Sequence, residues 1–164
     1  MKRYHRKVSE GNTAKGNMEV KDLTEFLVEV GFGQPRDGSN WEHEFSGKRV
    51  AWHDPCHLAH AQGVVDQPRK LLQQIPGIQF VPLSESSWCC GSAGIYNIIR
   101  PKDAALLLER KLRNIKRAEV DILVTANPGC EGQLRYGVRN SGLNTEVIHI
   151  ASFLAKIYAE KAPS

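Results

Sequence analysis

The amino-acid sequence predicts an α/β fold, with a mainly parallel sheet flanked by helices on both faces in a single domain. Short apolar runs alternate along the chain with segments of helical periodicity, which is typical of parallel strands joined by helices. The run at residues 121–127 is almost continuously apolar, as expected for a strand that is covered on both faces. With 164 residues, the chain is long enough to bury one substantial core.

The elements follow from the apolar spacing and from the positions of prolines and glycines. We expect residues 1–17 to be a flexible polar lead-in, because they contain nothing to bury, and residues 18–164 to form the domain. The predicted strands are residues 48–54, 78–83, 121–127 and 145–150. The predicted helices are residues 20–30, 56–61, 68–74, 92–99, 130–140 and 151–160, together with a long helix that begins at Pro101. Trp41 and Phe45 are expected to hold the loop at residues 34–48 against the domain.

The composition excludes several classes of function. The net charge of +4 is small and the basic and acidic residues are interleaved, so we expect no nucleic-acid partner. No apolar run approaches the roughly 20 residues that span a bilayer. The basic start of the chain is not followed by a hydrophobic segment, so no signal peptide is predicted. Four cysteines in such a chain indicate a reducing compartment, where thiols serve metals or redox chemistry more often than disulfides.

All four cysteines lie where a predicted strand gives way to a loop or a helix. Cys56 follows the first strand, Cys89 and Cys90 lie in the loop after the second, and Cys130 follows the third. The carboxyl ends of parallel strands lie at one edge of a sheet, so we expect the four thiols to meet there. Adjacent cysteines do not easily form a disulfide with each other, because the geometry is strained.

Four converging thiolates are typical ligands of zinc or of an iron–sulfur cluster. Zinc commonly binds close Cys-x-x-Cys pairs, and this sequence has none, which modestly favours a cluster. Ordinary buried cysteines and a disulfide framework are the alternatives to a metal site. We find no Ser/His arrangement or carboxylate pair for catalysis, and we therefore expect no catalytic residue in this chain.

Glycines and histidines accompany the cysteines. Gly91, Gly94 and Gly129 are placed where the backbone either makes an ordinary turn or approaches a metal centre with its N–H groups toward sulfur. His53, His57 and His60 surround Cys56, and we interpret His53 and His57 as hydrogen-bonding groups around a cluster. His57 and His60 suit a partner surface equally well.

The anchoring of the cysteines predicts which of them are preformed. Cys56 and Cys130 each follow a strand and a proline, so we expect this pair to be in place without metal. The loop at residues 84–94 has no such anchor, so we expect it to be the mobile part, with Cys89 and Cys90 standing apart.

Three motifs resemble a known family. They are His53-Asp54-Pro55-Cys56-His57, Trp88-Cys89-Cys90-Gly91-Ser92 and Asn127-Pro128-Gly129-Cys130. Together they resemble the cysteine-rich "CCG" domain, and in particular the carboxy-terminal domain of glycolate oxidase iron–sulfur subunits. The resemblance implies a [4Fe–4S] cluster, with zinc as the alternative, bound by Cys56, Cys89, Cys90 and Cys130.

The resemblance also implies a function and partners. Such a subunit carries electrons from a flavin subunit that oxidises glycolate to glyoxylate, toward the membrane electron-transport chain. The expected partners are the flavin-containing glycolate oxidase subunits and an N-terminal ferredoxin-like part of the same subunit. The expected location is the cytoplasm, at the inner face of the membrane, with contact made through the complex rather than through a transmembrane segment.

The sequence departs from the family pattern in two places. Some relatives carry a fifth cysteine in a Cys-x-x-Cys ending, and Gln133 stands at that position here. Full subunits have ferredoxin-like cysteine runs and a first domain of this type ahead of the matching part, so the chain resembles the last part of a longer subunit. Two other classes of function stay open, namely a zinc-binding or metal-free docking module and a thiol redox protein that uses Cys89 and Cys90.

Overall fold

The four predicted strands form one parallel sheet. The computed structural model describes residues 20–32 and 42–159. In that part of the chain, β1 (Arg49–Trp52), β2 (Gln79–Phe80), β3 (Ile122–Thr125) and β4 (Glu146–His149) lie in the order β2-β1-β3-β4. Each neighbouring pair is parallel. The predicted α/β class is therefore confirmed.

The strand order reverses between β1 and β3. From β1 the chain crosses to β2 on one side, returns to β3 on the other side of β1, and continues to β4. The connections that follow β1 and β3 therefore leave the sheet in opposite directions. At such a reversal a crevice opens outside the carboxyl ends of the strands, and ligands of parallel α/β folds bind there.

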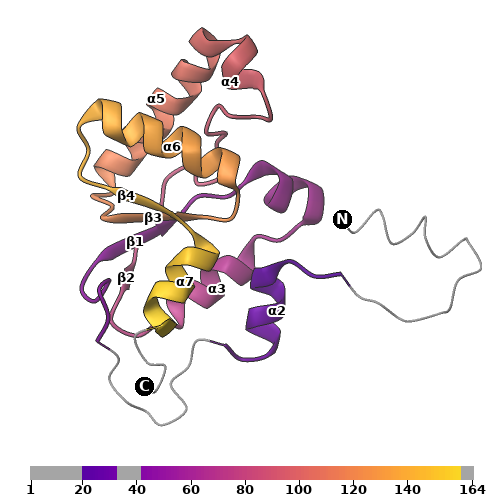
Figure 1. The fold of residues 1–164 in the computed structure, drawn as a ribbon, viewed down its shortest axis with the longest axis vertical. Helices are drawn as coiled ribbons and strands as arrows, with labels where there is room; N and C mark the ends of the chain where they lie inside the picture. The colour runs from indigo at the N-terminus through magenta and orange to yellow at the C-terminus, as the bar shows by residue number, and fades with distance from the viewer. Residues whose placement is uncertain (1–19, 33–41, 160–164) are drawn as a thin grey trace, which may run out of the picture.

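Helices cover both faces of the sheet (Figure 1). On one face, α5 (Pro101–Arg117) and α6 (Pro128–Ser141) form a core with the alternate residues Ala51, Leu123 and Val147 of the strands. On the other face, α3 (Asp66–Gln73) and α7 (Ile150–Ala159) form a core with Val50, Trp52, Ile122, Val124 and Ile148. We call these the α5–α6 layer and the α3–α7 layer. The predicted long helix from Pro101 is confirmed.

The remaining helices are short. α2 (Leu23–Glu29) lies beside α3 and begins with a capping box formed by Asp22 and Glu25. η1 (His57–Gln62) is a π-helical turn between β1 and α3, and α4 (Tyr96–Ile99) precedes α5. Among the described residues, no helix has both the length and the apolar character needed to cross a membrane. The predicted lead-in at residues 1–17 and Trp41 lie outside the described residues.

Two predicted elements are shorter than expected. The strand predicted at residues 78–83 is only Gln79–Phe80, because β2 is an edge strand and Pro82 has no N–H to continue the ladder. The helix predicted at residues 92–99 begins only at Tyr96, because Ala93 and Gly94 have φ of 35° and 71°, outside the helical region. Phe45 does hold its loop to the domain, packing 4.6 Å from Phe153 between ring centroids.

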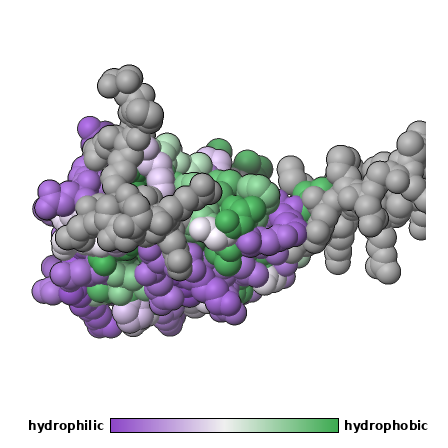
Figure 2. Space-filling model, turned by 90° about the horizontal axis from the view of Figure 1, so that it is seen from below, coloured by the Kyte–Doolittle hydropathy of each residue, from purple (hydrophilic) through white to green (hydrophobic). Residues whose placement is uncertain are grey.

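The end of the molecule that carries α2 and α7 has a mixed surface. Figure 2, which views this end from below, shows hydrophilic residues over much of the outline and smaller hydrophobic areas between them. Cys56, Cys89 and Cys90 lie in the connections that follow β1 and β2, and Cys130 lies in the first turn of α6, after β3.

Candidate metal centre

His53 reaches the candidate site because side chains alternate along β1. Val50 and Trp52 point into the α3–α7 layer and Ala51 points into the α5–α6 layer. His53 extends this strand, donating its N–H to the Val124 carbonyl at 2.9 Å, and so its side chain falls in the same layer as Ala51. The residue is 1% exposed.

Cys130 is placed by the start of α6. Asn127 is the N-cap residue, and its Oδ1 accepts a hydrogen bond from the Cys130 N–H at 2.9 Å. Pro128 occupies the first turn, where its missing N–H costs nothing. A Cβ on Gly129 would lie 3.0 Å from Asn127 Oδ1 and 3.1 Å from Ser92 Oγ, so this close packing favours glycine. Cys130 is buried in the α5–α6 layer.

Cys89 and Cys90 lie in a tight turn that depends on Gly91. Gly91 has a φ of 92°, and a Cβ at this position would lie 2.6 Å from the Ala104 carbonyl oxygen. The N–H of Gly91 points at Cys89 Sγ at 3.3 Å, and the N–H of Ser92 points at Cys90 Sγ at 3.5 Å. Both contacts would favour thiolate forms of sulfur.

Three of the predicted site residues meet in the α5–α6 layer. One ligand atom from each of His53, Cys90 and Cys130 lies within 4.8 Å of the other two, and all three residues are buried. Cys89 is half-buried and hydrogen-bonds to Cys90. Cys56 is exposed at the start of η1 and is not a member of this group. All four cysteines carry free thiols.

This arrangement corrects the expected preformed pair. We predicted that Cys56 and Cys130 would be in place and that Cys89 and Cys90 would stand apart, and this is wrong for Cys90, which hydrogen-bonds to Cys130. Proximity to a strand end was a poor guide, because Cys56 lies nearer to the end of β1 than Cys130 does to the end of β3. Cys56 is nevertheless exposed, whereas Cys130 is buried.

The loop at residues 84–94 is also anchored, contrary to our expectation. The Glu85 carboxylate accepts hydrogen bonds from Arg110 and from Asn114 on α5. The ammonium of Lys111 donates to the backbone carbonyls of Glu85 and Ser86. The Arg110 guanidinium lies 3.9 Å over the Trp88 ring. One polar face of α5 therefore holds the loop that presents Cys89 and Cys90.

Lys111 is the functional residue that sequence reasoning missed. It is fully buried in the chain, and its position on α5 matches the spacing of Ala104, Leu108 and Ile115. That spacing could have revealed Lys111 from the sequence. A lysine on the apolar face of a helix is buried, and a buried ammonium needs hydrogen-bond acceptors. Burial lowers its pKa to about 8, although Asp54 and Cys90 oppose the shift.

The buried residue Asp54 connects β1, α3 and the loop at residues 84–94. Asp54 accepts hydrogen bonds from Trp52 Nε1 at 2.8 Å and from the Arg69 guanidinium at 2.8 and 2.6 Å. Burial raises the pKa of Asp54, but the hydrogen bonds from Arg69 and Ser86 outweigh it, so the net shift is downward. Asp54 thereby fixes the backbone between His53 and Cys56.

Burial and mutual hydrogen bonds keep the site uncharged without metal. Burial, with a smaller effect from Lys111, lowers the pKa of His53 to about 3, so its imidazole is neutral. The hydrogen bond with Cys130 and burial raise the pKa of Cys90 to about 11. The hydrogen bond with Cys90 and burial raise the pKa of Cys89. A metal that binds these sulfurs must therefore displace protons.

His57 lies at the margin of the site. It is exposed, and its Nδ1 lies 3.3 Å from the Asn127 amide nitrogen. Because Asn127 caps the helix that carries Cys130, His57 contacts the support of a cysteine rather than a sulfur. His60 is exposed on η1.

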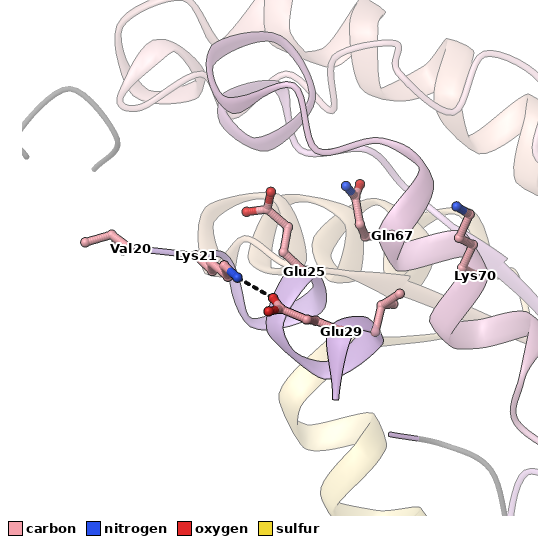
Figure 3. A pocket seen from close by; sticks show the side chains of 7 residues that line it. Val20, Lys21, Glu25, Glu29, Gln67 and Lys70 are labelled. Atoms are coloured by element: carbon pink, nitrogen blue, oxygen red, sulfur yellow. Dashed lines mark hydrogen bonds and ion pairs between the residues drawn. The ribbon is translucent and has the colours of Figure 1, made fainter. Parts of the chain in front are cut away.

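Hollows in the described structure also lie outside the cysteine group. A hollow of about 390 Å³ between α2 and α3 has a charged rim, where Lys21 pairs with Glu29 (Figure 3). It has no cysteine or histidine in its lining. A cleft of about 600 Å³ lies between α4, α5 and α6, and we call it the apolar cleft. Its lining includes Ser92, two residues after Cys90, and Gly129, the residue before Cys130.

The donor set fits a thiophilic metal centre. Two buried atoms in the α5–α6 layer, His53 Nδ1 and Thr125 Oγ1, have no hydrogen-bond partner in the described structure. Thr125 follows Val124, which pairs with Trp52, so it stands beside His53 at the end of the sheet. Buried polar atoms are rarely left unpaired, and neutral imidazole and cysteine sulfur are the ligands that zinc and iron prefer.

The fold and the site together define a parallel α/β domain with a group of buried cysteines and a histidine, able to hold a metal, at its switch point. A family model described as "Cysteine-rich domain" (CCG) matches residues 50–135. The chain belongs to this cysteine-rich domain family, as its motifs indicated.

Similar proteins are by name iron–sulfur, reductase or lactate-utilisation proteins. A probable glycolate oxidase iron–sulfur subunit of Bacillus subtilis is 34% identical over 145 residues, 87% of this chain and 32% of that protein. A fumarate reductase (CoM/CoB) subunit of Methanothermobacter marburgensis is 36% identical over 113 residues, 68% of this chain and 23% of that protein. Lactate utilization protein A of Oceanobacillus iheyensis is 34% identical over 133 residues, 81% of this chain and 52% of that protein. The chain thus spans about a third or less of the first two relatives and about half of the third.

Proposed function

We propose that this chain is the cysteine-rich part of an iron–sulfur electron-transfer subunit. The observation that carries the proposal is the meeting of His53, Cys90 and Cys130 within 4.8 Å in a buried layer at the switch point of the sheet. The name of the Bacillus subtilis relative, an iron–sulfur subunit, supports the same assignment.

In this proposal Cys56, Cys89, Cys90 and Cys130 bind a [4Fe–4S] cluster, and zinc is the alternative occupant. Cys90 and Cys130 are already in contact, and Cys89 adjoins them. Cys56 is exposed at the start of η1, so binding would require this segment to turn toward the other three. When bound, the cluster would accept and donate electrons one at a time.

The residues of this chain would hold the cluster rather than perform the oxidation. Oxidation of a 2-hydroxy acid such as glycolate to glyoxylate releases two electrons and two protons, which a flavin subunit would take up. This chain would carry the electrons onward, toward the electron-transport chain at the inner face of the membrane. Gly91 and Gly129 would let the backbone approach the cluster closely, and the N–H groups of Gly91 and Ser92 already point at sulfur.

The surface beside the site suits contact with a flavin-containing partner. Five large apolar side chains are exposed on α5, on α6 and around α4: Ile95, Ile98, Ile99, Leu106 and Tyr136. Ile98 and Tyr136 line the apolar cleft, together with Ser92 and Gly129, which are close in sequence to Cys90 and Cys130. Exposed apolar patches of this kind mark interaction sites. A partner docked here would be close to the cluster, as electron transfer requires.

A thiol redox enzyme is the second candidate class, and the site disfavours it. Reactive cysteines have a lowered pKa, because the thiolate is the nucleophile. Hydrogen bonding and burial raise the pKa of Cys89 and of Cys90 instead. These thiols are therefore poor nucleophiles until a metal takes their protons.

Metal analysis of the anaerobically purified chain tests the proposal. We expect iron and acid-labile sulfide in equal amounts. Zinc without sulfide would overturn the proposal in favour of a zinc-binding docking module. Absence of both metals, with rapid alkylation of Cys89 and Cys90 at neutral pH, would overturn it in favour of a thiol redox protein.

A further inference from the structure

One nitrogen of a buried histidine has no partner inside the protein. His53 is 1% exposed, and no hydrogen bond reaches its Nδ1 in the described structure. The ring also faces the Ser86 backbone carbonyl, and because Nδ1 makes no hydrogen bond we assign this contact to the Nε2–H group. A ring nitrogen of His53 belongs to the group that includes Cys90 and Cys130.

The bond to Ser86 decides what Nδ1 can do. A neutral imidazole has one N–H and one lone pair, and here the N–H is given to the Ser86 carbonyl. Nδ1 therefore carries the lone pair and cannot donate a hydrogen bond to sulfur. This argues against the role that we first assigned to His53, a hydrogen-bond donor around the cluster, and leaves a lone pair that only a proton donor or a metal can use.

We propose that Nδ1 of His53 is a direct ligand of the metal centre held by Cys90 and Cys130. The proposal rests on the proposed function and deepens it, because it puts a nitrogen ligand in the place of the exposed Cys56 at a site that was expected to be all-thiolate, so that the cluster keeps four protein ligands. Metal–nitrogen and metal–sulfur bonds of about 2.0 and 2.3 Å place a nitrogen and a sulfur ligand of one metal atom at most about 4.3 Å apart. The three donor atoms lie within 4.8 Å of one another, so side-chain shifts on the order of 1 Å would bring them to this spacing.

The surroundings of Ser86 support a ligand role. Metal-binding histidines commonly donate their other N–H to a backbone carbonyl, which fixes the tautomer and the ring orientation. The Ser86 carbonyl is itself held by the Asp54 N–H at 3.1 Å and by Lys111 Nζ at 3.1 Å. The imidazole is therefore fixed in orientation before any metal arrives. A histidine that served only to fill the layer would need neither this support nor a free lone pair.

Cobalt(II) binding to the metal-free chain tests the ligand directly, because thiolate-to-cobalt absorption reports the number of sulfur ligands. We expect His53→Ala to weaken cobalt(II) binding at least about tenfold. We expect His53→Cys to retain binding with stronger thiolate-to-cobalt absorption. His60→Ala, which removes an exposed histidine of the neighbouring turn, should match the wild type. Equal affinity and an unchanged spectrum in both His53 variants would overturn the proposal.

Pulsed electron paramagnetic resonance tests the ligand without any substitution of His53. The chain is labelled with ¹⁵N-histidine and either loaded with cobalt(II) or reconstituted with iron and sulfide and then reduced by one electron with dithionite. We expect a strongly coupled histidine nitrogen that persists in His57→Ala and His60→Ala. Absence of that coupling in a metal-loaded chain would overturn the ligand proposal alone. Failure to assemble iron and sulfide, with nitrogen coupling to cobalt(II) intact, would overturn the proposed function while supporting the ligand.

Discussion

At the residue scale, the surroundings of each polar group decide its role at the site. His53 Nδ1 and Thr125 Oγ1 are buried without partners, whereas Lys111 is buried with two carbonyls to bind. Unpaired buried groups cost stability and are rare. The site thus combines buried groups that are paired within the protein with buried groups that are not.

Gly91 is the residue whose substitution should damage the site most through the backbone. Gly91→Ala adds a Cβ 2.6 Å from the Ala104 carbonyl at a φ of 92°, so both the contact and the conformation are unfavourable. We expect a loss of about 2 to 3 kcal/mol in the free energy of unfolding, measured in urea. Gly142→Ala, at a φ of 66° in open space, should cost only about 1 kcal/mol. Equal losses would contradict the close approach at Gly91.

Lys111 should make stability depend on pH. Burial lowers its pKa from 10.5 in the unfolded chain to about 8, so between these pH values the unfolded chain binds a proton that the folded chain does not. The free energy of unfolding of the metal-free chain should therefore rise with pH across this window, by at most about 3 kcal/mol. This gain is lost as the pH falls back to about 8.

Urea denaturation at pH values near the two ends of that window measures the contribution of Lys111 to the pH dependence of stability. The free energy of unfolding of the wild type, minus that of Lys111→Met, should increase with pH, because the variant has no ammonium to deprotonate. Lys116→Met removes an exposed lysine of the same helix and should behave like the wild type. An identical pH dependence in Lys111→Met would show that burial of this ammonium has no energetic consequence.

Single residues were predictable from the sequence only where local chemistry settled their position. The sequence indicated the position of Cys130, because Asn-Pro-Gly after an apolar strand predicts the start of a helix, and Cys130 is the next residue. It did not reveal the unpaired Nδ1 of His53, because that depends on Ser86, which is distant in sequence. The exposure of Cys56 also escaped prediction, since a short π-helical turn has no clear periodicity.

At the scale of elements, α5 both packs against the sheet and holds the cysteine loop. Leu108 and Ile115 belong to the α5–α6 layer, while Arg110, Lys111 and Asn114 bind the loop at residues 84–94. The sequence predicted the packing of this helix, because periodicity reports an apolar face. It could not predict the loop anchors, because charged residues on a helix usually face solvent.

The contact between α5 and α6 depends on a glycine. A Cβ on Gly137 would lie 2.8 Å from Leu108 Cδ1, whereas a Cβ on Gly132 of the same helix would meet no atom within 4 Å. We expect Gly137→Ala to lower the free energy of unfolding by about 1 to 3 kcal/mol. Gly132→Ala should raise it by about 0.5 to 1 kcal/mol through helix propensity. If thermal melting ranks the two variants equally, the helices are not in close contact at Gly137.

At the scale of the whole molecule, the switch point places the proposed metal centre beside an exposed apolar surface. The connections from β1 and β3 diverge, and the cleft between α4, α5 and α6 opens next to Cys90 and Cys130. The sequence predicted the parallel sheet and the edge that carries the cysteines. It did not predict this surface, because its members come from three helices that are short or amphipathic.

Partner binding should depend on that surface. Ile98 is 73% exposed and lines the apolar cleft, so Ile98→Asp should leave the melting temperature unchanged and reduce co-purification with co-expressed flavin-containing subunits at least about tenfold. Phe26→Asp, at an exposed position on α2 in the α2–α7 end of the molecule, should co-purify normally. Loss of binding in both variants, or in neither, would contradict docking at the apolar cleft.

The proposed function requires that Cys90 and Cys130 hold one iron–sulfur centre. The most direct measurement is the iron and sulfide content of the anaerobically reconstituted wild type, Cys90→Ser and Cys130→Ser, with His60→Ala as control. We predict equal iron and sulfide in the wild type and in the control, and loss of most of both in the two serine variants, which remain folded by circular dichroism. Undiminished iron and sulfide in either folded serine variant, or a wild type that takes up neither, would contradict the account.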